Sequence, residues 1–168
     1  MKSHELPFFR NVLPASVFVL LIFCTTVSYA QAPTDFSGVW IQDNVKSDDF
    51  YKAFDVKCTI TQTPQTITIK MAFFDKIEKK EIASNDYFFT LDGKETSKEG
   101  HGGINKELAQ WSADKKTLTT KSTRTVGSDI YGSTATYSLS GNNLILTVQT
   151  SDINPGGLSV KQIFNKKQ

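Results

Sequence analysis

Side chains that commonly carry out catalysis are scarce in this sequence. Of its two histidines, only His101 lies outside the N-terminal thirty residues, in the glycine-rich stretch Glu99 to Gly103. A histidine-based catalytic triad needs an orienting acid and an activated nucleophile, and no spacing identifies either, so we interpret His101 as a solvated loop residue. The 17 acidic residues leave a hydrolytic carboxylate pair open, but none has a sequence signature. The sequence therefore predicts a protein that is not an enzyme.

Metal ligands and cofactor motifs are equally sparse. After the first thirty residues, one cysteine and one histidine are too few for a Cys/His metal site. An all-carboxylate site stays open, although no ligand-loop spacing points to one. No glycine-rich phosphate loop lies between a strand-like run and a helix-like run. We expect neither a bound metal nor a cofactor.

Cys58 is the only cysteine after the first thirty residues. It lies on the apolar face of a strand-like run, which favours a buried small hydrophobic residue. A reactive thiol is the alternative, but no histidine or cluster of basic residues lies nearby in the sequence to lower its pKa.

Arg124 is the most informative charge, because every other cation after the first thirty residues is a lysine. It alternates onto one face with Leu118, Thr120, Ser122 and Val126. If that face points into a barrel, the guanidinium must be paired, and a carboxylate ligand would pair it bidentately. Packing over a tryptophan, pairing with an internal acid, or exposure on the outer face are the alternatives. If the barrel holds an acidic amphiphile, we predict that Arg124 receives its head group.

Four aromatic residues accompany Arg124 as candidate ligand-binding residues. Phe73, Tyr87, Phe89 and Tyr137 fall on strand faces that we interpret as inward. A small barrel either fills with side chains or holds one small ligand, so these residues line a cavity or pack the core.

The elements that must position these side chains are strands. Val56 to Ile60 and Ile67 to Phe73 alternate apolar and polar residues, which is typical of half-buried strands. About ten such runs follow one another, with turn signals roughly every ten residues, and this spacing favours an all-β barrel or sandwich. Asp92-Gly93 is a strong signal for a tight hairpin. No helix-length connection separates the strands, so an antiparallel arrangement is expected.

The first strand-like run contains Gly38 and Trp40 and precedes one helix-like segment. Ser47 can cap a short helix, and Phe50 and Phe54 stand four residues apart on one helical face. We therefore expect one short helix after the first strand.

Residues 1–30 have the features of a secretory signal peptide. Lys2 and Arg10 precede the apolar run 17–23, and Ser28 and Ala30 supply the small residues of a cleavage site. The apolar run is shorter than the twenty or so residues of a membrane span; an uncleaved anchor is the alternative. We expect export to the periplasm or the exterior, a single domain over residues 31–168, and no integral membrane span in the mature chain.

Three short stretches resemble a known family. Phe36-Ser37-Gly38-Val39-Trp40 resembles the glycine-any-tryptophan signature of lipocalin-type barrels. Together with 87–94 and 111–118, it is similar to bacterial secreted lipocalin-like (calycin-type) proteins. The resemblance implies structural roles for Gly38 and Trp40, with Trp40 closing the barrel floor under an arginine from late in the chain. That arginine has no clean match, because the final strand offers Lys161 instead and Arg124 lies two or three strands earlier. Fatty-acid-binding proteins are a second resemblance, but their two-helix lid is longer than residues 41–55 can supply.

These observations predict a single antiparallel, up-and-down, lipocalin-like barrel of about 8–10 strands. Its expected function is non-catalytic binding of a small apolar or amphipathic molecule outside the cytoplasm. The alternative is an envelope-associated or secreted interaction module with a filled core. An interior cavity of about 300 Å³ or more favours the ligand. The net charge of +2 implies no nucleic-acid partner.

Overall fold

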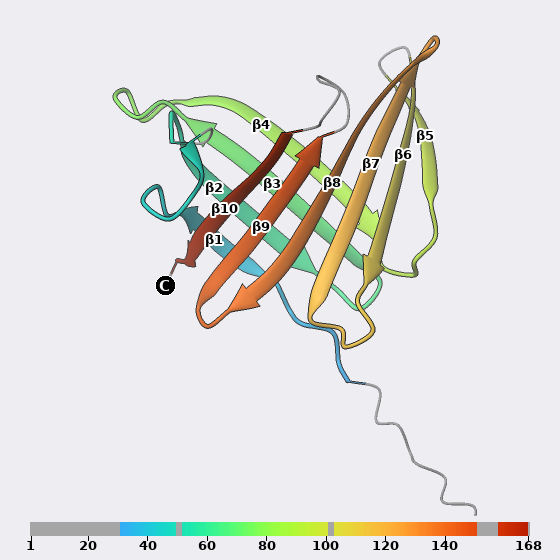
Figure 1. Cartoon of the computed structure of the whole chain (residues 1–168), viewed down its shortest axis with the longest axis horizontal. Helices are drawn as coiled ribbons and strands as arrows, with labels where there is room; N and C mark the ends of the chain where they lie inside the picture. Colours follow the sequence, from blue (N-terminus) through green and yellow to red (C-terminus); the bar gives the residue numbers. More distant parts are fainter. Residues whose placement is uncertain (1–30, 50–51, 101–102, 151–157, 168) are drawn as a thin grey trace, which may run out of the picture. The chain divides into compact units, whose positions relative to one another are not determined.

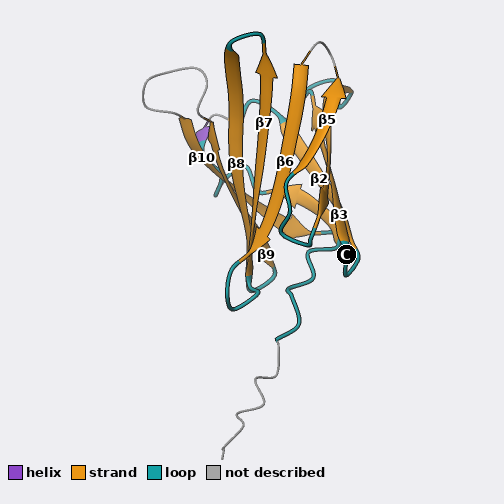
Figure 2. Ribbon diagram, turned by 90° about the vertical axis from the view of Figure 1, so that its right-hand side faces the viewer, coloured by secondary structure: helices purple, strands orange, loops and turns teal. Residues whose placement is uncertain are grey.

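The computed structural model describes residues 31–49, 52–100, 103–150 and 158–167, and strands make up most of this part of the chain (Figures 1 and 2). The strands are β1 (Gly38–Gln42), β2 (Asp55–Gln62), β3 (Thr66–Phe74), β4 (Glu81–Thr90), β5 (Thr96–Gly100), β6 (Gly103–Trp111), β7 (Thr117–Val126), β8 (Asp129–Ser140), β9 (Asn143–Thr150) and β10 (Leu158–Lys166). In this part of the chain, no helix is long and apolar enough to cross a membrane.

The ten strands form one antiparallel sheet in the order β4-β3-β2-β1-β10-β9-β8-β7-β6-β5. Successive strands pair except β4 and β5, and β1 pairs with both β2 and β10, so the first and last of these strands meet. Figure 1 shows β2–β4 behind β7–β9, with the sheet curled into two facing walls. The sheet is a nearly closed up-and-down barrel, which confirms the predicted all-β antiparallel class.

The barrel is interrupted between β4 and β5, where the sequence predicted a tight hairpin. Gly93 does turn the chain, with a φ of 73°, but β5 pairs only with β6 in the described sheet. The Leu91 N–H instead donates to the carbonyl of Gln65 at 2.7 Å. The hairpin prediction is wrong. The turn residues redirect the chain, but they do not supply the cross-strand hydrogen bonds that would pair β4 with β5.

The helix predicted after β1 is not confirmed. The described residues of this connection, 43–49 and 52–54, form turns and bends apart from a single 3-10 residue at Asp49, and Phe50 lies outside the described residues. Ser47 is buried, and its hydroxyl accepts a hydrogen bond from the Ile163 N–H of β10 at 3.0 Å. The proposed capping residue therefore attaches this connection to the sheet.

Alternation along the strands places the core as predicted. Cys58 of β2 lies opposite Met71 of β3, and Ile60 lies opposite Ile69; all four side chains are buried. On β7, Leu118 and Thr120 are buried while Lys121 is exposed. The Leu118 face is therefore the inner face, which answers the question left open for Arg124.

A cluster of aromatic side chains closes one end of the barrel, here called the floor. Trp40 is 2% exposed, and its indole Nε1 donates to the Phe36 carbonyl at 2.9 Å. Phe36 is fully buried and stacks on Trp111, with ring centroids 5.7 Å apart. The segment before β1 thus plugs the floor.

The cation over Trp40 is Lys166, whose Nζ lies 5.2 Å from the ring centroid. Lys161, which the sequence offered for this position, alternates onto the outer face of β10, where its backbone N–H donates to Asp48. Because side chains alternate between the two faces of a strand, Lys161 and Lys166 point to opposite faces of β10, and only Lys166 reaches the inside.

Candidate functional site

A cavity of about 90 Å³ lies inside the barrel above the floor. All four predicted aromatic residues line it: Phe73, Tyr87, Phe89 and Tyr137. Tyr87 and Phe89 are nearly parallel, with ring centroids 6.4 Å apart. The four aromatic residues come from facing walls of the barrel. Phe73 and Phe89 lie on β3 and β4, while Tyr137 lies on β8.

This interior cavity also has a polar side. Thr120 and Gln162 are buried in its lining. The Gln162 side-chain amide donates to Gln42 Oε1 at 3.1 Å, and Gln42 in turn donates to Asn44 at 2.7 Å. These amides are satisfied within the protein, so they orient one another before any ligand arrives.

The volume of the interior cavity is below the 300 Å³ that the sequence analysis set as favouring a ligand. Trp40, Phe36, Leu118 and Phe164 fill the barrel beneath it. The lower half of the barrel is therefore a packed core, and any binding space must extend toward the open end.

Such a space adjoins the interior cavity. A hollow of about 290 Å³, here called the side hollow, shares Tyr87, Ser122 and Ser133 with the interior cavity. Its other lining residues are Asp86, Asn105, Lys106, Glu107, Thr123, Arg124, Tyr131 and Gly132. It lies where β4 runs beside β6. The apolar interior thus continues into a polar, charged compartment.

Arg124 lies in the side hollow, on the inner face of β7. It pairs in register with Asn105 of β6 and Tyr131 of β8. The residue is exposed, because its position near the end of β7 lies beyond the packed core. Arg124 does not pack over Trp40, whose cation is Lys166. The structure brings Arg124 together with Tyr87 in one lining, and its role toward a ligand stays a prediction.

Glu107 is a charged wall residue that the sequence analysis did not name. It is half-buried on the inner face of β6, opposite Ser122. Burial raises the pKa of its carboxyl group, and the charge of Lys98 partly offsets this effect. Burial also raises the pKa of Tyr87. The alternation of Glu107 with Ala109 and with Trp111 is the sequence signal that could have identified it.

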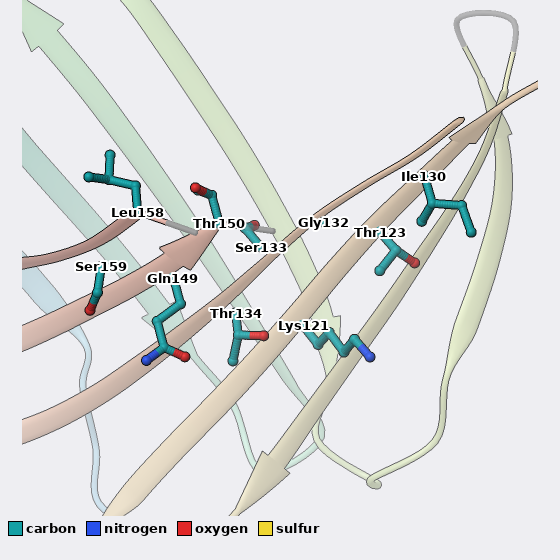
Figure 3. Close-up of a pocket in the computed structure, with 10 residues that line it drawn as sticks. All are labelled: Lys121, Thr123, Ile130, Gly132, Ser133, Thr134, Gln149, Thr150, Leu158 and Ser159. Carbon is teal, nitrogen blue, oxygen red and sulfur yellow. The ribbon is translucent and has the colours of Figure 1, made fainter. Parts of the chain in front are cut away.

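Another hollow, of about 600 Å³, lies on the other side of the sheet (Figure 3). Lys121, Thr134, Gln149 and Ser159 form one register row across β7–β10, and this row alternates with the inward-facing residues. None of the predicted site residues lines this outer hollow. Its position outside the barrel makes it a poorer binding space for an apolar chain.

A metal-ligand cluster and a reactive thiol are two further features that can indicate chemistry. Within 31–49, 52–100, 103–150 and 158–167, no group of three or more His, Cys, Asp or Glu residues is placed to hold a metal ion. Burial raises the pKa of the Cys58 thiol to about 12. The thiolate is the nucleophilic form of cysteine, so Cys58 behaves as a core residue near neutral pH.

Comparison with known proteins supports the fold. No protein-family model matches the chain, and no curated protein matches its sequence. Among solved structures, secretory abundant heat soluble protein 4 from Ramazzottius varieornatus is similar over 82% of this chain and 99% of its own, with a TM-score of 0.56 and 15% identity.

Two further solved structures have the same arrangement. The "REP1-NXSQ fatty acid transporter" covers 79% of this chain and 96% of its own length, with a TM-score of 0.52 and 13% identity. Fatty-acid-binding protein 1 of Echinococcus granulosus covers 79% and 98%, with a TM-score of 0.50 and 12% identity. This chain has a calycin-type barrel fold.

Proposed function

We propose that this protein is an exported barrel that binds a small amphipathic molecule without chemically changing it. The observation that carries the proposal is the continuity of two unlike compartments. Tyr87, Ser122 and Ser133 line both the interior cavity, with its aromatic walls, and the side hollow, with its charged walls. An amphipathic ligand would place its apolar part inward and its polar head in the side hollow.

The comparisons support this proposal. Two of the similar structures are named for fatty-acid transport or binding, and a ligand of that kind has the apolar and polar parts that the two compartments would accept. The interior cavity of about 90 Å³ limits the buried part to a short apolar segment. The proposed ligand therefore enters the barrel only partly.

Within this proposal, Arg124 receives an acidic head group. A charge-assisted contact to a guanidinium contributes about 1.5–3 kcal/mol, and the exposure of Arg124 places the expected gain at the low end of that range. Arg124→Gln should weaken binding of an alkyl carboxylate roughly tenfold and leave the matching alkyl alcohol almost unaffected.

The measurement is a paired titration of both probes against wild type and Arg124→Gln at neutral pH. Lys121→Gln is the matched control, since it removes a positive charge from the outer face of the same strand. Equal losses for both probes would assign Arg124 a structural role. Failure of both probes to bind wild type would overturn the proposed function.

A filled-core interaction module is the second candidate function. The packed lower barrel supports it, as do three well-exposed apolar side chains on or next to β4: Ile77, Ile82 and Phe88. Two results together would favour this candidate. Wild type would bind neither probe, and it would retain a partner protein that the Ile82→Ser and Phe88→Ser variants lose.

The proposal also includes export. Residues 1–30 supply the signal-peptide features, and the plug at Phe36 lies a few residues after the expected cleavage site at Ala30. N-terminal sequencing of protein secreted by its own host should begin at Gln31. A chain that retains Met1 in the cytoplasm would contradict the proposal.

A further inference from the structure

A carboxyl group and a guanidinium share one wall of the side hollow. On β6, Asn105 lies opposite Arg124 and Glu107 lies opposite Ser122. Glu107 and Arg124 are therefore diagonal neighbours on the inner face, a spacing within reach of long side chains. Both residues line the side hollow.

Charged and titratable groups approach Glu107 from several elements. Lys98 faces inward on β5 two residues from Thr96, the register partner of Glu107. Lys106, next to Glu107 on β6, is paired with Glu95 at 2.9 Å. The remaining such groups in the lining are Asp86 and Tyr87 on β4, Arg124 on β7 and Tyr131 on β8. Of the two carboxyl groups in this described lining, the one on Glu107 faces the inside of the barrel.

This arrangement affects which head group the side hollow accepts. An anionic head group bound to Arg124 would lie close to the Glu107 carboxylate, because Arg124 and Glu107 are diagonal neighbours on adjacent strands. Repulsion between like charges at that separation, in a partly exposed site, weakens binding roughly tenfold. A neutral or zwitterionic head avoids this repulsion and uses both groups, with an acceptor on Arg124 and a donor on Glu107.

We propose that Glu107 is a specificity-determining residue that disfavours singly anionic head groups at neutral pH and admits them once it is protonated. At neutral pH an acidic head group on Arg124 then binds more weakly than it would beside a protonated Glu107, whereas a net-neutral amphiphile with a hydrogen-bonding head does not incur this loss. This inference rests on the proposed function and identifies the ligand class of the same site. The upward shift in the pKa of Glu107 caused by burial brings its protonation closer to mildly acidic conditions.

The test uses two probes with the same ten-carbon chain. Decyl sulfonate keeps its negative charge across the pH range, and decyl glycerol ether is neutral. Each is titrated against residues 31–168 of the wild type, Glu107→Gln and Glu99→Gln, at pH 7.5 and pH 4.5. Glu99→Gln is the matched control, because Glu99 alternates onto the outer face of β5 and is exposed. Far-ultraviolet circular dichroism checks that each protein is folded at both pH values.

We expect wild type and Glu99→Gln to bind the sulfonate more tightly at pH 4.5 than at pH 7.5, by up to roughly tenfold as Glu107 becomes protonated. Glu107→Gln should bind it at pH 7.5 at least as tightly as wild type does at pH 4.5, and the ether should bind all three proteins equally at both pH values. A pH dependence that persists in Glu107→Gln, or an equal change for both probes, would overturn the inference while the proposed function stands. Failure of both probes to bind wild type would overturn both.

Discussion

Replacement of Trp40 by alanine should destabilise the barrel by about 3–5 kcal/mol, the range for removing a large buried aromatic side chain. The structure supports a value in the upper half of that range. Trp40 is 2% exposed, its Nε1 donates to the Phe36 carbonyl at 2.9 Å, and Lys166 lies over its ring. The alanine variant leaves a cavity, an unpaired carbonyl and a lysine without its aromatic partner.

Trp40→Phe separates these contributions. It keeps an aromatic ring but removes the indole N–H, so the Phe36 carbonyl loses its buried donor. That loss should destabilise by about 1–3 kcal/mol. Ile41→Ala is the matched control, because Ile41 is the next residue of β1, faces outward and is 40% exposed. Its expected effect is below about 1 kcal/mol.

The assay is equilibrium unfolding in urea, followed by circular dichroism so that loss of a tryptophan does not alter the signal. The free energy of unfolding should decrease in the order Ile41→Ala, Trp40→Phe, Trp40→Ala, with similar slopes against urea concentration. A Trp40→Ala protein with the midpoint of the parent would refute the assignment of Trp40 to the barrel floor.

Three more outcomes follow from the described side chains. The Cys58 thiol, whose pKa burial raises to about 12, should react with a thiol reagent at pH 8 only after unfolding; rapid labelling of the native protein would contradict this. Gly38→Ala should destabilise by about 1–3 kcal/mol, measured by urea unfolding, because Gly38 has a φ of 140° and a Cβ there would lie 3.0 Å from Lys166; an unchanged midpoint would argue against it. The backbone N–H groups three and two residues after Asp75 hold the pKa of its carboxyl group below the usual value, so its stabilising contribution is complete above pH 4 and is lost as the pH falls through the folded-state pKa. Asp75→Asn should thus remove part of the loss of stability below pH 4, and an identical acid profile for the variant would contradict the reasoning.

The strands of the barrel could be predicted because period-two alternation is a local property. Ile67, Ile69 and Met71 alternate with polar residues, and the structure buries all three. Phe36 could not be placed, because it precedes the first strand in a segment without periodicity. The choice of Lys166 over Lys161 depends on the register between β10 and β1, which joins the two ends of the chain.

The residues of the site also differ in how well local alternation predicts them. Phe73, Tyr87, Phe89 and Tyr137 are apolar enough to mark an inner face, and they share one cavity. The polar inner residues of the upper barrel resemble outward-facing residues in sequence, which is why Glu107 was missed. Sequence alternation identifies an inner face only where that face is apolar.

The pairing of β1 with β10 also determines when the barrel can fold. The Gln162 side chain reaches Gln42 across 120 residues of sequence, and Lys166 lies opposite Trp40. Until the nine residues of β10 leave the ribosome, β1 lacks one neighbour and the floor lacks Phe164. Folding must then wait until β10 has been synthesised, and contacts of such high sequence separation are typical of domains that fold in milliseconds to seconds. A growing chain of this topology therefore remains open, with its aromatic floor residues accessible to chaperones, until its last strand is complete.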